Sequence, residues 1–202
     1  MDPKYRITAG LIGGLGVLVL GTQIMLSLGR TGMGLGATLW ALAAFFTILT
    51  NALMAATMLT IAVTGRRLSF GWMTMVTQSM IVVGVVYHLL LAHLFNFSGL
   101  RWWTDQALHT ILPAIMLWFW LMETTRHDPR GGRPLLWLIW PAGYAVYAMV
   151  RGALTGWYPY PFLNVGQLGI GAVATNMAAM VVGFAVLGYA LNFIGQRMPL
   201  RD

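Results

Sequence analysis

Long apolar blocks alternate with short polar breaks along the whole chain. The blocks reach roughly 20 residues, the length that an α-helix needs to cross a bilayer. Gly, Pro and charged residues gather in the breaks, as in ETTRHDPRGGRP (123–134) and TGWYPYPFLN (155–164). Backbone polar groups in lipid need internal partners, so each block is predicted to be helical. The pattern predicts six membrane-spanning helices near 8–29, 38–64, 72–95, 103–122, 135–154 and 169–196.

Composition supports an all-α, polytopic membrane protein. The chain is 58% apolar and 8% charged, whereas a soluble domain carries about 25% charged residues. No long polar linker interrupts residues 1–202, so we expect a single integral-membrane domain. The net charge of +7 comes from short loops without a dense basic run, so no nucleic-acid partner is expected. The absence of cysteine excludes disulfides, thiolate metal sites and cysteine nucleophiles.

The loop charges predict the topology of the six helices. One side of the predicted bundle carries the larger basic group: Lys4, Arg6, Arg66, Arg67, Arg126, Arg130, Arg133, Arg197 and Arg201. The other side carries Arg30, Arg101 and Arg151. Because cytoplasmic loops are enriched in Lys and Arg, both termini are predicted to lie in the cytoplasm.

Polar side chains inside five of the predicted helices share one depth. They lie between about three and six residues outward of the centre of each helix, or roughly 5–9 Å at the helical rise. The members of this layer are Thr47, His88, His109, Arg151 and Asn176. Ionisable residues are costly in lipid and mark functional sites. The layer predicts a polar cavity in the outer half of the bundle.

Helical spacing assigns candidate roles within this layer. Asp105 and His109 are four residues apart and therefore share a helix face. An Asp that orients a His, and a His that deprotonates a Thr hydroxyl, reproduce the logic of a hydrolase triad. Thr47 is the candidate nucleophile, and Thr50 beside it is the alternative.

The remaining candidates would bind substrate or its oxyanion. Asn51, Asn176 or His88 could donate a hydrogen bond to an oxyanion. Tyr144, Tyr147 and Arg151 form a stripe at helical spacing that could bind a carboxylate head group.

Pro113 also favours a site on the fourth predicted helix. A proline nitrogen cannot donate to the carbonyl four residues earlier, so the carbonyl of His109 is expected to be free. Prolines are nevertheless tolerated in membrane helices for packing reasons alone.

Other interpretations account for single residues of the layer. A membrane Thr commonly hydrogen-bonds its own helix backbone, a His or Asn can join two helices, and Arg151 could extend to the interface. A b-type haem would need two facing histidines, for which His88 and His109 qualify. A transporter or receptor for a lipid or small anion could use the same cavity without chemistry. No spacing resembles a metal motif, so neither a metal nor a cofactor is expected.

Three stretches resemble one known family. LHTILP (108–113), WYPYPFLN (157–164) and FFTILTN (45–51) resemble the androgen-induced-gene family of six-span membrane proteins and its bacterial relatives. Animal members are threonine hydrolases of fatty acid esters of hydroxy fatty acids. The resemblance places the base at His109 and the nucleophile at Thr47. Asn164 stands where the family has an acidic residue.

The resemblance also implies a substrate and a location. The substrate would be a lipid ester that enters from the bilayer. The protein would lie in the bacterial plasma membrane with its site toward the outer half. Neither the substrate's chain length nor the oligomeric state follows from the sequence.

Overall fold

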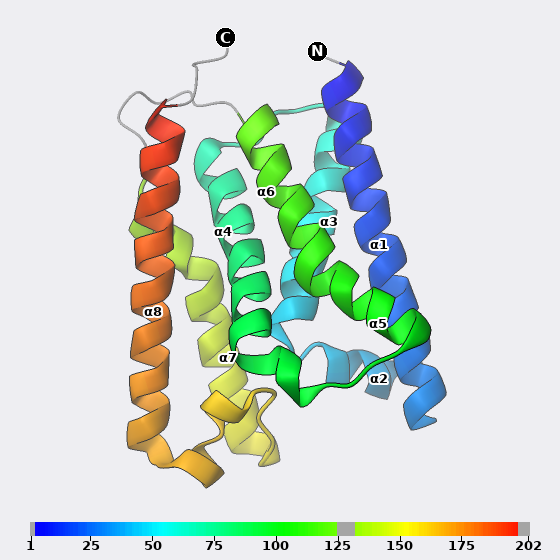
Figure 1. The fold of residues 1–202 in the computed structure, drawn as a ribbon, viewed down its shortest axis with the longest axis vertical. Coiled ribbons are helices and arrows are strands. Elements are labelled where there is room, and N and C mark those ends of the chain that lie inside the picture. Colours follow the sequence, from blue (N-terminus) through cyan, green and yellow to red (C-terminus); the bar gives the residue numbers. More distant parts are fainter. Residues whose placement is uncertain (1–2, 125–131, 198–202) are drawn as a thin grey trace. The chain divides into compact units, whose positions relative to one another are not determined.

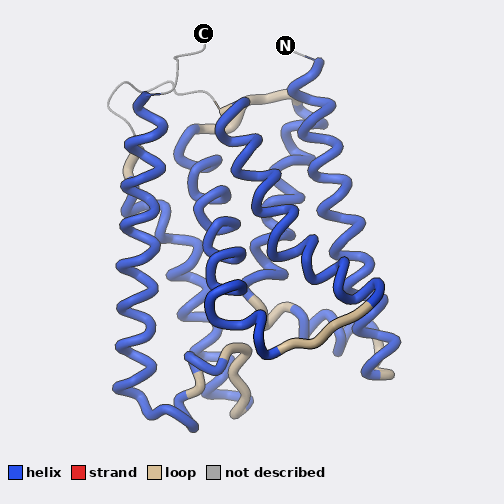
Figure 2. Tube along the Cα trace, viewed as in Figure 1, coloured by secondary structure: helices blue, strands red, loops and turns tan. Residues whose placement is uncertain are grey.

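The computed structural model describes residues 3–124 and 132–197, which form helices and loops without any strand. Figure 2 shows these helices and the short loops between them. The predicted all-α fold is confirmed for these described residues. Four helices are long and apolar enough to cross a membrane, namely Pro3–Thr31, Phe46–Thr64, Phe70–Leu94 and Val165–Arg197.

The chain divides into two compact units, Met1–Thr125 and Arg126–Asp202, called unit 1 and unit 2 below. The α-helices of unit 1 are α1 (Pro3–Thr31), α2 (Leu35–Leu42), α3 (Phe46–Thr64), α4 (Phe70–Val86), α5 (Gly99–Gln106) and α6 (Leu112–Glu123). Three short turns extend or join these helices. Two of them are π-helical, η1 (Tyr87–Leu91) and η3 (Ala107–Ile111), and one is a 3-10 turn, η2 (Ala92–Leu94).

The helices of unit 1 meet in an apolar core. Its largest fully buried side chains include Trp120, Phe119, Met54, Met58 and Met80. The Trp120 indole still needs a hydrogen-bond acceptor when buried, and its Nε1 donates to Thr74 Oγ1 at 2.9 Å. This polar group therefore has its partner inside the core, as a membrane interior requires.

One end of unit 1 is formed where α1 and α4 begin and α6 ends (Figure 1), and two arginines bond to backbone there. Arg6 donates to the carbonyls of Ala62 and Val63 near the end of α3. Arg67 donates to the carbonyl of Glu123 at 2.8 Å. The other end of unit 1 carries α2, η1, η2 and α5 (Figure 1).

The expected helix over 38–64 is wrong in one respect, because residues 43–45 interrupt it. α2 ends at Leu42, and α3 begins at Phe46 after Phe45 adopts an extended conformation with φ −93° and ψ 129°. The residues at the break are Ala-Ala-Phe, without Gly or Pro, so no local signal marks it. Tertiary packing overrides helix propensity at this break, because Ala44 is completely buried.

The expected helix over 103–122 is also more irregular than predicted. It begins at Gly99, passes through η3 and ends at Glu123. The other predicted helices agree with the structure within a few residues, although 72–95 ends in the turns η1 and η2.

Unit 2 contains η4 (Pro134–Leu138), α7 (Ile139–Thr155), η5 (Pro161–Leu163) and α8 (Val165–Arg197). α8 is kinked at Gly169, whose φ of 77° suits glycine. The Asn192 side chain accepts from the Gly132 amide at 2.7 Å.

Candidate active site

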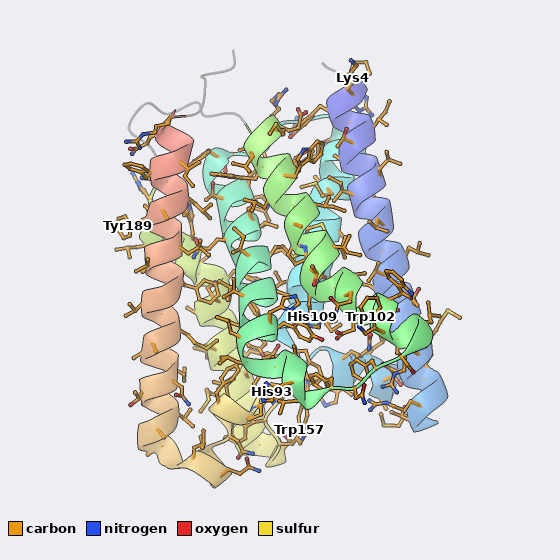
Figure 3. The ribbon with its side chains drawn as sticks, in the orientation of Figure 1. Lys4, His93, Trp102, His109, Trp157 and Tyr189 are labelled. Atoms are coloured by element: carbon orange, nitrogen blue, oxygen red, sulfur yellow. The ribbon has the colours of Figure 1, made fainter. Side chains whose placement is uncertain are left out.

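Thr47 and His109 meet inside unit 1, although 62 positions separate them in the chain. Thr47 lies in the first turn of α3, and His109 lies in the middle of η3. Thr47 Oγ1 is 3.3 Å from His109 Nε2, close to hydrogen-bonding distance for a hydroxyl and its base. Figure 3 shows His109 on the segment between α5 and α6.

Asp105 holds the other imidazole nitrogen of His109. His109 Nδ1 is 2.9 Å from the backbone oxygen of Asp105 and 3.2 Å from its carboxylate oxygen Oδ1. A backbone carbonyl can only accept, so Nδ1 carries a proton and Nε2 of the neutral ring has a lone pair. The Thr47 hydroxyl therefore donates to Nε2. The i,i+4 spacing predicted this Asp–His contact, and the structure has it.

Tyr87 completes the surroundings of His109 and was missed in the sequence. Its hydroxyl donates to Asp105 Oδ2. Its ring stacks on the His109 imidazole, with centroids 3.9 Å apart and planes 14° apart. The available signal was its position next to His88, at the depth of the polar layer. Tyr87 thus fixes both the carboxylate and the plane of the imidazole.

Asn51 joins the helix of Thr47 to the turn of His109. Its Nδ2 donates to the carbonyl of Thr47 at 2.9 Å and to the carbonyl of Leu108 at 3.3 Å. Both amide hydrogens are therefore engaged, and the side chain is completely buried. Asn51 was predicted as a possible oxyanion donor, but in this arrangement it holds two backbone segments together.

The π-helical geometry of η3 explains how His109 reaches Thr47. The amide of Leu112 bonds to the carbonyl of Ala107 rather than of Leu108, which leaves the carbonyl of Leu108 available to Asn51. Pro113 has no amide hydrogen for the carbonyl of His109. Gly84 packs against that carbonyl, because a Cβ built on Gly84 would lie 2.9 Å from the oxygen.

The break at 43–45 also shapes the site, because it puts Thr47 in the first turn of a helix. The backbone N–H groups of Thr47 and Ile48 make no backbone hydrogen bond within the described part of the chain. The first N–H groups of any helix lack intrahelical partners. They also carry the positive end of the helix dipole. No sequence signal pointed to these donors.

The other candidates in unit 1 have different surroundings. Thr50 is completely buried one turn along α3, whereas the hydroxyl that contacts His109 Nε2 belongs to Thr47. His88 lies at the surface of unit 1, and its Nε2 is 2.8 Å from Thr110 Oγ1. His88 was predicted to bind substrate or an oxyanion, and the structure pairs it with Thr110.

The predicted residues of unit 2 include an aromatic and cationic group on α7. Arg151 is buried, and its Nη1 donates to the hydroxyl of Tyr147 at 2.8 Å. The rings of Tyr144 and Tyr147 lie 6.2 Å apart. Asn176 donates to the carbonyl of Phe162 at 2.9 Å and so holds the loop before α8.

The ring nitrogens bear on possible metal or haem binding. The Nε2 atoms of His88 and His109 each contact a threonine hydroxyl, and the ring of Tyr87 lies against both imidazoles. Residues 3–124 and 132–197 contain no group of three or more His, Cys, Asp or Glu side chains that could hold a metal ion.

Comparison of the chain with protein-family models, curated proteins and solved structures gave no match. The geometry around His109 is therefore the basis for a functional proposal.

Proposed function

We propose that the chain is an intramembrane threonine hydrolase that cleaves lipid carboxylic esters. The observation that carries the proposal is the contact between Thr47 Oγ1 and His109 Nε2 at 3.3 Å, with Asp105 holding Nδ1 on the other side of the ring. A nucleophile, a base and an orienting group in this order form the triad arrangement. The resemblance to the androgen-induced-gene family supports the same two residues.

The reaction would proceed through an acyl-enzyme. Thr47 Oγ1 attacks the ester carbonyl carbon while its proton passes to His109 Nε2. The tetrahedral intermediate collapses, and the leaving alkoxide takes that proton as the ester C–O bond breaks. His109 then removes a proton from water, which attacks the acyl carbon, and the proton returns to Thr47 as the carboxylic acid leaves.

The first turn of α3 supplies candidate donors for the oxyanion. The N–H groups of Thr47 and Ile48 have no backbone acceptor among the described residues, and they belong to the same turn as the attacking hydroxyl. Backbone N–H groups aimed at a developing oxyanion stabilise the transition state more than the ground state. In this proposal they donate to the oxyanion, the role that the sequence suggested for Asn51, His88 or Asn176.

A lipid ester suits the setting, and fatty acid esters of hydroxy fatty acids are the first substrates to test. The role of Arg151, with Tyr144 and Tyr147, in binding a carboxylate head group remains a prediction. Arg151→Ala should raise KM more than it lowers kcat, because uniform binding energy appears in KM. The reverse pattern would remove Arg151 from substrate binding.

The proposed topology has six spans, both termini in the cytoplasm, and the site toward the outer half of a bacterial plasma membrane. Two observations in unit 1 support the orientation. Arg6 and Arg67 gather at one end of unit 1, as cytoplasmic basic residues do. Thr47 lies in the first turn of α3, whereas Arg6 contacts residues near the last turn of the same helix.

The test is ester hydrolysis by purified protein in detergent, with hydroxy fatty acid esters and p-nitrophenyl acyl esters as substrates. Thr47→Ala and His109→Ala should abolish activity, whereas Thr50→Ala should retain it. Thr22→Ala is the matched control, because the Thr22 hydroxyl only bonds the carbonyl of Leu18 in its own helix. Loss of activity in Thr50→Ala but not in Thr47→Ala would reassign the nucleophile.

A folded wild-type protein without activity on any ester would overturn the hydrolase proposal. Bound lipid recovered intact would then favour the transporter or receptor. A Soret band in the purified protein would favour the haem alternative instead.

A further inference from the structure

A chain of polar side chains leads from Asp105 to the surface of unit 1. The Tyr87 hydroxyl donates to Asp105 Oδ2, and the Gln106 side chain interacts with the same hydroxyl. Thr110 Oγ1 is 3.0 Å from Gln106 Oε1, and His88 Nε2 is 2.8 Å from Thr110 Oγ1. We call these four residues the donor chain: Tyr87, Gln106, Thr110 and His88.

The carboxylate of Asp105 determines the direction of every bond in this chain. An ionised carboxylate only accepts, so the Tyr87 hydroxyl donates to it and the Tyr87 oxygen must accept from the Gln106 amide nitrogen. The Gln106 oxygen then accepts from the Thr110 hydroxyl.

The same rule fixes the tautomer of His88. The Thr110 hydroxyl has already donated to Gln106, so Thr110 Oγ1 accepts from His88, whose Nε2 must therefore carry a hydrogen. His109 is fixed in the opposite tautomer, because its Nδ1 faces the Asp105 carbonyl at 2.9 Å.

We propose that the donor chain positions Asp105 and, through Asp105, the imidazole of His109. Aligned hydrogen bonds polarise one another, and this effect is stronger in an interior of low dielectric constant. All four members donate toward the carboxylate, so each one strengthens the hydrogen bond of Tyr87 to Asp105 and holds Asp105 in contact with His109 Nδ1. His88 is thus a positioning residue and does not contact the substrate. Its consequence for turnover rests on the proposed function, whereas its effect on His109 does not.

The test is nitrogen NMR of histidine-labelled full-length protein in nanodiscs, which reports the tautomer of each ring directly. The chain has four histidines, so single histidine variants suffice to assign the signals. Wild type should show His109 as the Nδ1–H tautomer and His88 as the Nε2–H tautomer. The opposite tautomer at His88 would overturn the proposal.

Two substitutions should disturb His109 from a distance. His88→Phe removes the terminal donor, and Thr110→Val removes the hydroxyl while keeping the shape of the side chain. Each should move the His109 Nδ1–H resonance. His88→Gln keeps a side-chain N–H donor and should restore the wild-type resonance. His93→Phe is the matched control, because His93 is an exposed histidine in η2 outside the donor chain.

Kinetics give the second measurement. His88→Phe and Thr110→Val should lower kcat about two- to tenfold, the range of one ordinary hydrogen bond, with KM unchanged. An unmoved His109 resonance in both variants, or an equal shift in His93→Phe, would overturn the proposal. If the His109 resonance moves in these variants but the protein has no esterase activity, the donor-chain proposal stands and the hydrolase proposal is rejected.

Discussion

Unit 1 contains two threonine–histidine contacts of nearly the same kind, and they differ in what they can do. Thr47 Oγ1 lies 3.3 Å from His109 Nε2, and Thr110 Oγ1 lies 2.8 Å from His88 Nε2. Both histidines lie in π-helical turns, η3 and η1. By residue type and distance alone, the exposed pair is the better hydrogen bond.

The difference lies in the further group that each threonine–histidine pair contacts. His109 Nδ1 faces the carbonyl of Asp105, so Nε2 is left to accept a proton from Thr47. The Thr110 hydroxyl faces Gln106 Oε1, so it has no hydrogen left for His88. The same two residue types thus form a hydroxyl donor with an imidazole acceptor at Thr47 and His109, and an imidazole donor with a hydroxyl acceptor at His88 and Thr110. The orienting group decides which histidine can act as a base.

The largest expected effect on the rate of ester hydrolysis comes from substituting the histidine of each contact in turn. His109→Gln should slow ester hydrolysis about 10²- to 10⁴-fold, the usual contribution of a general base. His88→Gln should leave the rate close to wild type, because it keeps the donor to Thr110. Initial rates on one p-nitrophenyl ester decide this. Equal losses in both variants would refute the asymmetry between the two contacts.

Asp105→Asn should have an intermediate effect. A neutral carboxamide loses the charge beside His109 Nδ1, but the backbone carbonyl at 2.9 Å remains and keeps the tautomer. We expect kcat to fall about 10- to 10²-fold, the range of a hydrogen bond to a charged group. Single-turnover kinetics should place the loss in acylation. A loss as large as that of His109→Gln would mean that the carbonyl does not hold the tautomer.

Tyr87→Phe should lower kcat less, because it removes the hydroxyl of Tyr87 and keeps its aromatic ring. The ring can still stack on His109, whereas the hydrogen bond to Asp105 is lost. A hydrogen bond to a charged group contributes about 1.5–3 kcal/mol, and only the part transmitted through Asp105 reaches His109, so kcat should fall about tenfold or less. Tyr87→Leu, which also removes the stacking, is the comparison. Identical rates for Phe and Leu would show that stacking contributes nothing.

Gly84→Ala should lower the thermal stability more than it lowers the rate of ester hydrolysis. The added Cβ would meet the carbonyl oxygen of His109 at 2.9 Å, and backbone cannot yield cheaply. Overpacking of this kind costs about 1–3 kcal/mol, so thermal unfolding in detergent should begin at a lower temperature. Gly21→Ala is the control, since nothing lies within 4 Å of its added Cβ. A lower unfolding temperature in Gly21→Ala alone would contradict the close packing at Gly84.

The sequence was informative where contacts are local. The i,i+4 spacing of Asp105 and His109 predicted their contact, and the missing amide of Pro113 indicated irregular backbone near His109. The resemblance to a known family paired His109 with Thr47 across 62 positions of chain. Apolar periodicity and composition were enough to predict a helical membrane protein.

The rest could not be predicted, for physical reasons. Depth along a helix does not tell which way a side chain points, so His88 was grouped with His109 although it contacts Thr110. Tyr87 has no spacing relation to Asp105, and only tertiary packing brings them together. The break at 43–45 has neither Gly nor Pro, so the uninterrupted apolar block predicted a continuous helix.

The three irregular segments around His109 have a consequence for protein design. Residues 43–45, η1 and η3 each give up regular helical hydrogen bonds, which is costly in lipid. An idealised bundle that carried Thr47, Asp105 and His109 on straight helices would lack the turn that aims the imidazole and the helix start that presents the hydroxyl. A graft of this site must therefore include its backbone defects. Substitutions that repair those defects should raise the unfolding temperature and lower the rate together.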